Sequence, residues 1–210
     1  MTHFAHLWLF FVLVLGVVVL PGLDMAYIMG SALAGGRRAG FAALAGVLAG
    51  GICHVVMTGL GISVLLGIIP AAFNALLVAG ALYIAWIGIS LLRCESAFGV
   101  VATAERPLGA TFRQGMLTCL LNPKAYLFML AIFPQFLRPE YGELGIQAVV
   151  LWLIIAINQL CIYGALALAA DRAREWLSHK PAAGAIVARG VGVLLIGAAM
   201  LTGVEGWRGG

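Results

Sequence analysis

Residues 145–170 read GIQAVVLWLIIAINQLCIYGALALAA and contain no charged side chain. As an α-helix this stretch would be about 39 Å long, whereas the hydrocarbon core of a membrane is about 30 Å thick. The whole chain of 210 residues is 63% hydrophobic and only 10% charged. Soluble domains carry roughly 25% charged residues. Composition therefore predicts an integral membrane protein, and we attribute the net charge of +4 to loop topology and not to nucleic-acid binding.

Similar apolar runs recur along the chain, separated by charged or turn-forming residues. They predict about six transmembrane helices, at 5–30, 41–66, 71–92, 114–137, 145–170 and 186–204. The expected fold is a single all-α transmembrane domain over 1–210, made of two inverted three-helix repeats at about 1–92 and 114–210. A cytoplasmic loop at about 93–113 would join the repeats.

Lysine and arginine are distributed unevenly between the predicted loops. The first, third and fifth loops hold nine, namely Arg37, Arg38, Arg93, Arg106, Arg113, Arg172, Arg174, Lys180 and Arg189. The other side holds only Arg138 and Arg208. Because cytoplasmic loops retain positive charge, we expect the odd loops inside a bacterial inner membrane and both termini outside. A first helix that does not fully span would instead place the N-terminus inside.

Small residues follow one face of the second predicted helix. They recur every three or four positions, which is the spacing of one helix face, at Gly36, Gly40, Ala43, Gly46, Gly50, His54, Thr58 and Gly61. A stripe of small residues lets the backbones of membrane helices approach closely. We therefore expect Gly46 and Gly50 to be packing positions near the centre of the bundle.

Two segments, LPGLD at 20–24 and LNPKAY at 121–126, interrupt apolar helices with a proline close to a charge. Proline breaks a helix because it lacks an N–H and clashes with the preceding turn, so the first and fourth helices are expected to be broken. Paired breaks at corresponding positions of inverted repeats are typical of a transport site at the repeat interface. The residues concerned are Pro21, Gly22 and Asp24 in the first segment, and Asn122, Pro123 and Lys124 in the second.

Asp24 and Lys124 are the leading site candidates because ionisable groups inside a bilayer are costly. A ligand carboxylate would sit at a half-helix N-terminus or near Lys124, and a ligand ammonium would pair with Asp24, which favours a small zwitterion. Alternatively, the two residues only pair with each other, or Lys124 extends to water. His54 fits either a structural histidine or a proton relay. Gln159 fits either a hydrogen bond between helices or a substrate contact.

The order and spacing of these motifs resemble the lysine exporter/homoserine-threonine exporter (LysE/RhtB) family of amino-acid efflux proteins. The resemblance covers nearly the whole chain and rests on PGLD at 21–24, GRRAG at 36–40, LNPKA at 121–125 and FPQF at 133–136. One departure is Leu23, which stands where the family usually has a second proline. The resemblance implies amino-acid export driven by the proton gradient, without ATP. The sequence leaves a monomer and a homodimer as alternatives.

Other classes of protein fit the sequence less well. An intramembrane aspartyl protease would need a second membrane aspartate besides Asp24, and a zinc protease would need an H-E-x-x-H motif, which the sequence lacks. The four cysteines, Cys53, Cys94, Cys119 and Cys161, have no metal-ligand spacing. We therefore expect no enzyme, no metal and no cofactor. A membrane scaffold subunit remains an alternative, because it would need the small-residue face but not the two charged breaks.

Overall fold

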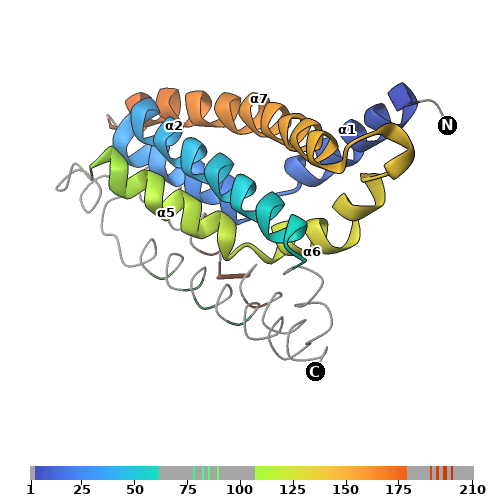
Figure 1. The fold of residues 1–210 in the computed structure, drawn as a ribbon. Helices are drawn as coiled ribbons and strands as arrows, with labels where there is room; N and C mark the ends of the chain where they lie inside the picture. The colour runs from blue at the N-terminus through green and yellow to red at the C-terminus, as the bar shows by residue number, and fades with distance from the viewer. Residues whose placement is uncertain are drawn as a thin grey trace.

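The protein is built from helices, and the computed structural model describes them over residues 3–61 and 107–178, together with single residues between 78 and 89 and between 190 and 200. Every regular element in these ranges is helical, as Figure 1 shows. In chain order the elements are α1 (His3–Val19), α2 (Leu23–Gly59), α5 (Leu108–Leu120), α6 (Pro123–Ala131), the 3-10 helices η1 (Phe133–Phe136) and η2 (Pro139–Tyr141), and α7 (Leu144–Ser178). The all-α prediction is confirmed for this part of the chain.

Two helices, α2 and α7, are long and apolar enough to cross a membrane. The bent pair formed by α5 with the α6–η1 segment can count as a third span, and α1 is a shorter apolar helix. The chain is therefore a multi-pass membrane protein. The third and sixth predicted helices, 71–92 and 186–204, lie outside the described residues except for single helical positions such as Leu82 and Val193.

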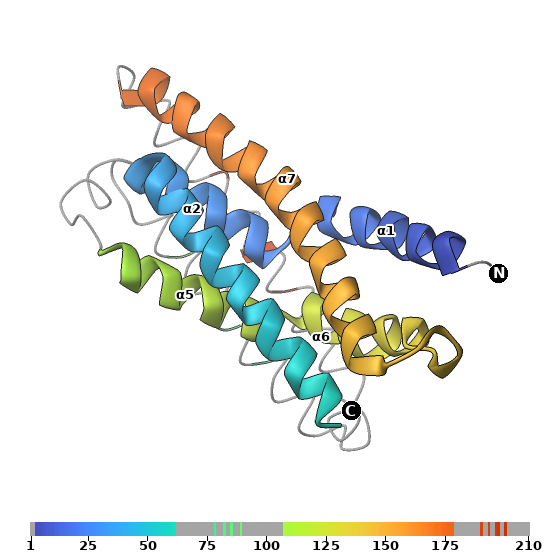
Figure 2. The ribbon, with the colours of Figure 1, turned by 45° about the horizontal axis from the view of Figure 1, so that its top comes forward.

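α2 folds back on itself at Gly36. This residue has a φ of 73° and a ψ of −174°, which interrupts the helix with a conformation that glycine adopts readily. A Cβ built on Gly40 would lie 2.8 Å from the Cβ of Ala32, although residues eight apart in a straight helix are about 12 Å apart. The two arms of α2 therefore form a hairpin, which the ribbon in Figure 2 displays. The turn lies in the first loop that the sequence predicts, between the helices at 5–30 and 41–66.

The helical backbone is broken at both proline motifs. α1 ends at Val19 and α2 begins at Leu23, whereas α5 ends at Leu120 and α6 begins at Pro123. The bend between α5 and the α6–η1 segment is 51°. Figures 1 and 2 show that α1 with the first arm of α2 runs in the opposite direction to α5 with α6. The chain thus contains two antiparallel broken helices.

Several helix boundaries differ from the sequence prediction: the second helix, predicted at 41–66, ends at Gly59, and two further differences have a common cause. The sequence predicts a start at 114 for the fourth helix, but α5 starts at Leu108, inside the segment assigned to the 93–113 loop. It predicts an end at 170 for the fifth helix, but α7 continues to Ser178 and includes Asp171 and Arg174. These two predicted boundaries are wrong for the same reason, because charged residues end an apolar run in the sequence without ending the helix.

α2 packs against α5 more extensively than against any other described helix. A Cβ built on Gly46 would overlap the backbone oxygen of Phe112, and one built on Gly115 would overlap the backbone oxygen of Ala43. A Cβ on Gly50 would lie 2.7 Å from the Cβ of Cys119 on α5. The backbones of α2 and α5 therefore touch where each helix presents glycine to the other.

Residues that are distant in sequence meet at the two ends of the molecule. At one end, which we call the Gly36 end, the backbone N–H of Arg37 donates to Asp171 Oδ1 at 2.9 Å. At the other, the His3 end, the rings of His3 and Tyr141 pack at a tilt with centroids 4.8 Å apart. The first and fifth predicted loops thus share one end, and the chain start and the fourth loop share the other. The alternating charge pattern requires this arrangement.

Candidate functional site

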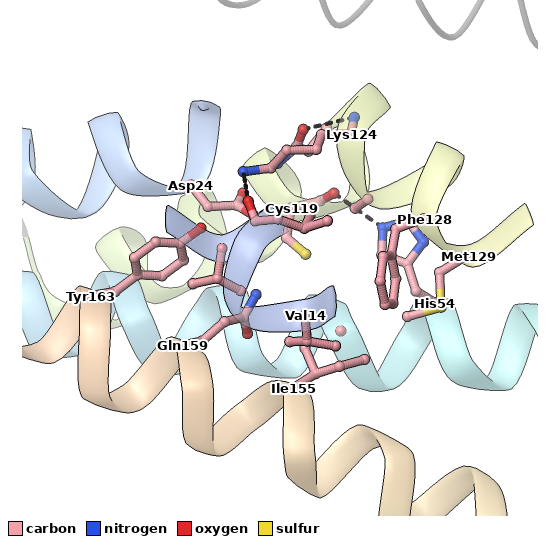
Figure 3. Close-up of a pocket in the computed structure, with 15 residues that line it drawn as sticks. Val14, Asp24, His54, Cys119, Lys124, Phe128, Met129, Ile155, Gln159 and Tyr163 are labelled. Atoms are coloured by element: carbon pink, nitrogen blue, oxygen red, sulfur yellow. Dashed lines mark hydrogen bonds between the residues drawn. The ribbon is translucent and has the colours of Figure 1, made fainter. Parts of the chain in front are cut away.

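The two helix breaks border one internal cavity, shown in Figure 3. Its volume is about 50 Å³, which leaves room for a few water molecules at ~10–15 Å³ each. A ligand as large as an amino acid therefore requires the walls to move apart. The lining comes from α1, both arms of α2, the α5–α6 break and α7, and consists of Val14, Val17, Val18, Asp24, Gly51, His54, Cys119, Asn122, Lys124, Ala125, Phe128, Met129, Ile155, Gln159 and Tyr163.

Asp24 lies in the first turn of α2, directly after the first break, and its side chain is 3% exposed. Glycine at the preceding N-cap, Gly22, offers no side-chain acceptor to the helix N-terminus, so the carboxylate of Asp24 is the anionic group there. It interacts electrostatically with Lys124 and Asn122. Its Oδ1 atom is buried without a hydrogen-bond partner among the described residues.

Asn122 and Pro123 start α6 by two complementary effects. The side chain of Asn122 accepts a hydrogen bond from the backbone N–H of Lys124 at 3.1 Å and so caps the helix. Pro123 occupies the first helical position, where its missing N–H costs nothing. The cap fixes the amide of Asn122 at the cavity wall. Its Nδ2 atom is buried and finds no acceptor in the described part of the chain.

Lys124 bridges the two broken helices. Its ammonium donates to the backbone oxygens of Val17 at 3.2 Å and of Leu20 at 3.0 Å. These oxygens lie at the C-terminal end of α1, where carbonyls lack helical partners and favour a cation. Figure 3 shows the side chain reaching back toward Asp24, yet the two charges form no ion pair. The only ion pair within residues 3–61 and 107–178 joins Arg138 and Glu140 at 3.4 Å.

His54 performs the matching role at the second break. Its Nε2 donates to the backbone oxygen of Cys119 at 3.1 Å, close to the C-terminal end of α5. A carbonyl can only accept, so Nε2 carries the hydrogen and Nδ1 of the neutral ring is an acceptor. Nδ1 is buried and has no partner among the described residues. The two breaks are therefore capped crosswise, each by a side chain from the other half of the chain.

Three buried polar atoms without partners in the described ranges thus face one cavity, namely Asp24 Oδ1, Asn122 Nδ2 and His54 Nδ1. Leaving a buried polar group unpaired costs about 1–3 kcal/mol, and such groups are rare in native proteins. A polar ligand in the cavity could form hydrogen bonds with all three atoms and with the Lys124 ammonium beside them. The cavity therefore offers hydrogen-bond donors and acceptors, together with both signs of charge.

Other lining residues complete the site, and the sequence predicted only one of them. Gln159 lies on the α7 wall, whereas its neighbour Asn158 donates to the backbone oxygen of Ile154 at 2.9 Å within the same helix. Tyr163 is fully buried and lies on the Asp24 side of the cavity in Figure 3. In a chain this hydrophobic, the sequence does not distinguish the apolar lining residues from other apolar residues. Only those on α7 could have been predicted, because they lie one helical turn from Gln159.

Gly22 gives the Lys124 side chain the space that it occupies. A Cβ built on Gly22 would lie 3.1 Å from Lys124 Nζ and 3.3 Å from Cε. Its φ of −164° is open to any residue, so the backbone tolerates substitution. We expect Gly22→Ala to leave folding intact, because the contact is with the end of a flexible side chain, and to lower transport about threefold to tenfold by displacing the ammonium, as about 1 kcal/mol would.

The matched control for Gly22→Ala is Gly16→Ala on α1, where an added Cβ meets nothing within 4 Å. Both variants are compared by initial transport rate per folded protein in membrane vesicles. Equal rates in the two variants would mean that the position of the ammonium does not matter to transport.

Comparison with known proteins identifies the family. A model described as the LysE type translocator matches residues 15–206. The chain belongs to the LysE type translocator family. The resemblance found in the motifs is thereby confirmed, and as a LysE type translocator the protein is a membrane transport protein and not an enzyme.

Several curated relatives share most of the length of this LysE type translocator. A homoserine/homoserine lactone efflux protein of Salmonella typhimurium is 30% identical over 158 residues, which are 75% of this chain and 76% of the relative. A leucine efflux protein of Salmonella choleraesuis is 25% identical over 192 residues, 90% of this chain and 91% of the relative. An uncharacterized membrane protein of Pseudomonas aeruginosa is 29% identical over 196 residues, which are 90% of this chain and 91% of the relative. No solved structure matches the chain.

Proposed function

We propose that this translocator exports a small neutral amino acid and binds it in the central cavity. The convergence of unpartnered donors and acceptors on that cavity, among the residues that the structure describes, carries the proposal. Asp24 is the acceptor for the ammonium of the amino acid. Asn122 Nδ2 and the Lys124 ammonium are the donors for its carboxylate. Hydrogen bonds between charged groups are stronger than those between neutral groups, and excluding water from the site strengthens them more.

A neutral side chain fits the rest of the cavity. Apolar walls are supplied by Val14 on α1, Phe128 on α6 and Ile155 on α7. A charged substrate side chain buried among them would have no counter-ion in the described lining, because Asp24 and Lys124 are taken by the two α-groups. One relative is named for efflux of homoserine and homoserine lactone and another for efflux of leucine, and the side chains of homoserine and leucine are both neutral.

Competition at Asp24 supplies a route to proton coupling. A protonated carboxyl group has no negative charge with which to hold the substrate ammonium. Substrate and proton therefore bind Asp24 in alternation, and an inward flow of protons drives the amino acid outward. His54, whose Nδ1 atom faces the same cavity, is the second group that can take a proton.

The same proposal orients the protein in a bacterial inner membrane. Arg37, Arg172 and Arg174 belong to the Gly36 end, which we assign to the cytoplasm because cytoplasmic loops retain positive charge. The His3 end then faces outward. The antiparallel course of the two broken helices supports the division into inverted repeats at 1–92 and 114–210, joined by the cytoplasmic loop at 93–113.

Expression in bacteria that are loaded with dipeptides tests the function whichever amino acid is carried. Peptidases release high internal amino-acid concentrations, and every amino acid in the medium is then measured over time. We expect faster appearance of one or a few neutral amino acids than in cells that carry Asp24→Asn. If the protein is present in the inner membrane and no amino acid exceeds that control, the proposed function is wrong.

A further inference from the structure

A second cavity lies at the His3 end, and the central site does not include it. Its volume is about 260 Å³, and it is enclosed by the start of α1, η1, the loop around η2 and the start of α7. Its polar and ionisable lining residues are His3, His6, Tyr141, Glu143 and Gln147. We call it the outer cavity. It is larger than the central cavity, and these five side chains bring polar groups into walls that are otherwise apolar.

The two cavities follow the same helix faces. On α1, Leu7 lines the outer cavity and Val14 lines the central one. On α7, Leu151 lines the outer cavity and Ile155, one helical turn further on, lines the central one. One turn of helix is about 5.4 Å. The barrier between the cavities is therefore one turn deep along α7 and two turns deep along α1, where it lies at the level of Phe10.

Four phenylalanine rings fill this barrier. Phe10 is completely buried, and its ring centroid lies 4.9 Å from that of Phe136, 5.9 Å from Phe128 and 6.3 Å from Phe133. Phe136 lines the outer cavity and Phe128 lines the central cavity. The cluster thus reaches from one cavity to the other. Aromatic rings in tilted and edge contacts pack well but hold each other by little more than dispersion and weak quadrupole attraction.

We propose that the outer cavity is the release station of the transport path and that Phe10, Phe128, Phe133 and Phe136 form the gate between it and the central site. The amino acid leaves the Asp24–Lys124 site when the Phe10 ring swings aside, and it enters the outer cavity at the His3 end. This inference rests on the proposed function. It adds a second station and assigns the outer barrier to rings from α1, α6 and η1.

Native Cys119 is a reporter for the gate, since it lines the central cavity and is 2% exposed. The test protein keeps Cys119 alone, with Cys53, Cys94 and Cys161 replaced by alanine. A membrane-impermeant thiol reagent is applied either from the His3 side or from the Gly36 side. We expect Phe10→Ala to accelerate labelling of Cys119 at least tenfold from the His3 side and to leave the rate from the Gly36 side unchanged.

Phe11→Ala is the matched control, because Phe11 stacks on Trp8, with centroids 5.2 Å apart, and not on the gate. It should label like the parent protein. An unchanged rate in Phe10→Ala, or an equal rise from both sides, would overturn the gate, because an equal rise indicates a generally loosened fold. If Phe10→Ala does not accumulate as folded protein, Phe10→Leu serves in the same comparison.

Two further cysteines locate the barrier with Phe10 intact. In a protein without other cysteines, Leu7→Cys should react from the His3 side and Val14→Cys should not, and similar rates at both positions would contradict the proposal. Labelling needs no transported substrate. If labelling follows the prediction but no amino acid is exported, the proposed function is wrong and the gate is supported. If an amino acid is exported but labelling does not change in Phe10→Ala, the gate alone is wrong.

Discussion

Asp24→Asn is expected to abolish export while the protein still folds. The substitution is isosteric, and Asp24 Oδ1 has no hydrogen-bond partner within the described residues, so the fold loses only the interaction of the charge with the α2 N-terminus, Lys124 and Asn122. It removes the charge that holds the substrate ammonium. Loss of a charged hydrogen-bond partner costs about 1.5–3 kcal/mol, and loss of the proton-binding carboxylate also ends coupling. Efflux from preloaded proteoliposomes under a pH gradient should therefore fall by about 100-fold per folded protein.

Lys124→Gln should lower both folding and export. The Val17 and Leu20 carbonyl oxygens lose their donor, which the neutral amide replaces poorly. The double variant Asp24→Asn with Lys124→Gln should export nothing. The two residues form no ion pair with each other, so removing both charges does not restore transport; it removes both contacts with the substrate. Near-normal export by the double variant would mean that the charges serve stability alone. Glu140→Gln, at an exposed ion pair, is the carboxyl-to-amide control.

Gly46→Ala should destabilise the protein although alanine is the better helix former. The added Cβ overlaps the backbone oxygen of Phe112. Such overpacking costs about 1–3 kcal/mol, which exceeds the roughly 1 kcal/mol that alanine contributes over glycine in a helix. Gly115→Ala should behave alike, since it meets the backbone oxygen of Ala43. The measurement is the thermal midpoint of the purified protein in detergent, read by size-exclusion chromatography.

Gly109→Ala on α5 is the matched control for the packing variants. An added Cβ there meets nothing within 4 Å, so only the gain in helix propensity remains and the midpoint should stay or rise. A midpoint for Gly46→Ala at or above that of the parent would contradict the close contact between α2 and α5.

Some of this structure follows directly from the sequence, and some does not. The prolines of the LPGLD and LNPKAY motifs predict the two breaks because proline has a local effect on any helix. Asp24 and Lys124 could be singled out because a charge in an apolar run is conspicuous. Their relationship could not be predicted, because an ion pair and the observed carbonyl caps have the same sequence pattern.

The gate residues were beyond sequence reasoning for a different reason. The chain has 10 phenylalanines, and nothing local distinguishes Phe10, which is buried between two cavities, from Phe11 beside it. Burial against a distant segment is a tertiary property. The role of His54 as a cap for the Cys119 carbonyl is also tertiary, because it joins residues 65 positions apart.

Counterflow in proteoliposomes tests most directly whether the central cavity recognises an amino acid by both of its α-groups. The purified protein is reconstituted, loaded with the amino acid that cells export, and supplied outside with that amino acid in labelled form or with analogues that lack one α-group. We predict rapid exchange of the intact amino acid, and exchange at least tenfold slower for the amine without a carboxylate and for the acid without an ammonium, as loss of about 1.4 kcal/mol or more at either Asp24 or Lys124 requires. Equal exchange of either analogue would contradict the site that we assign between the two helix breaks.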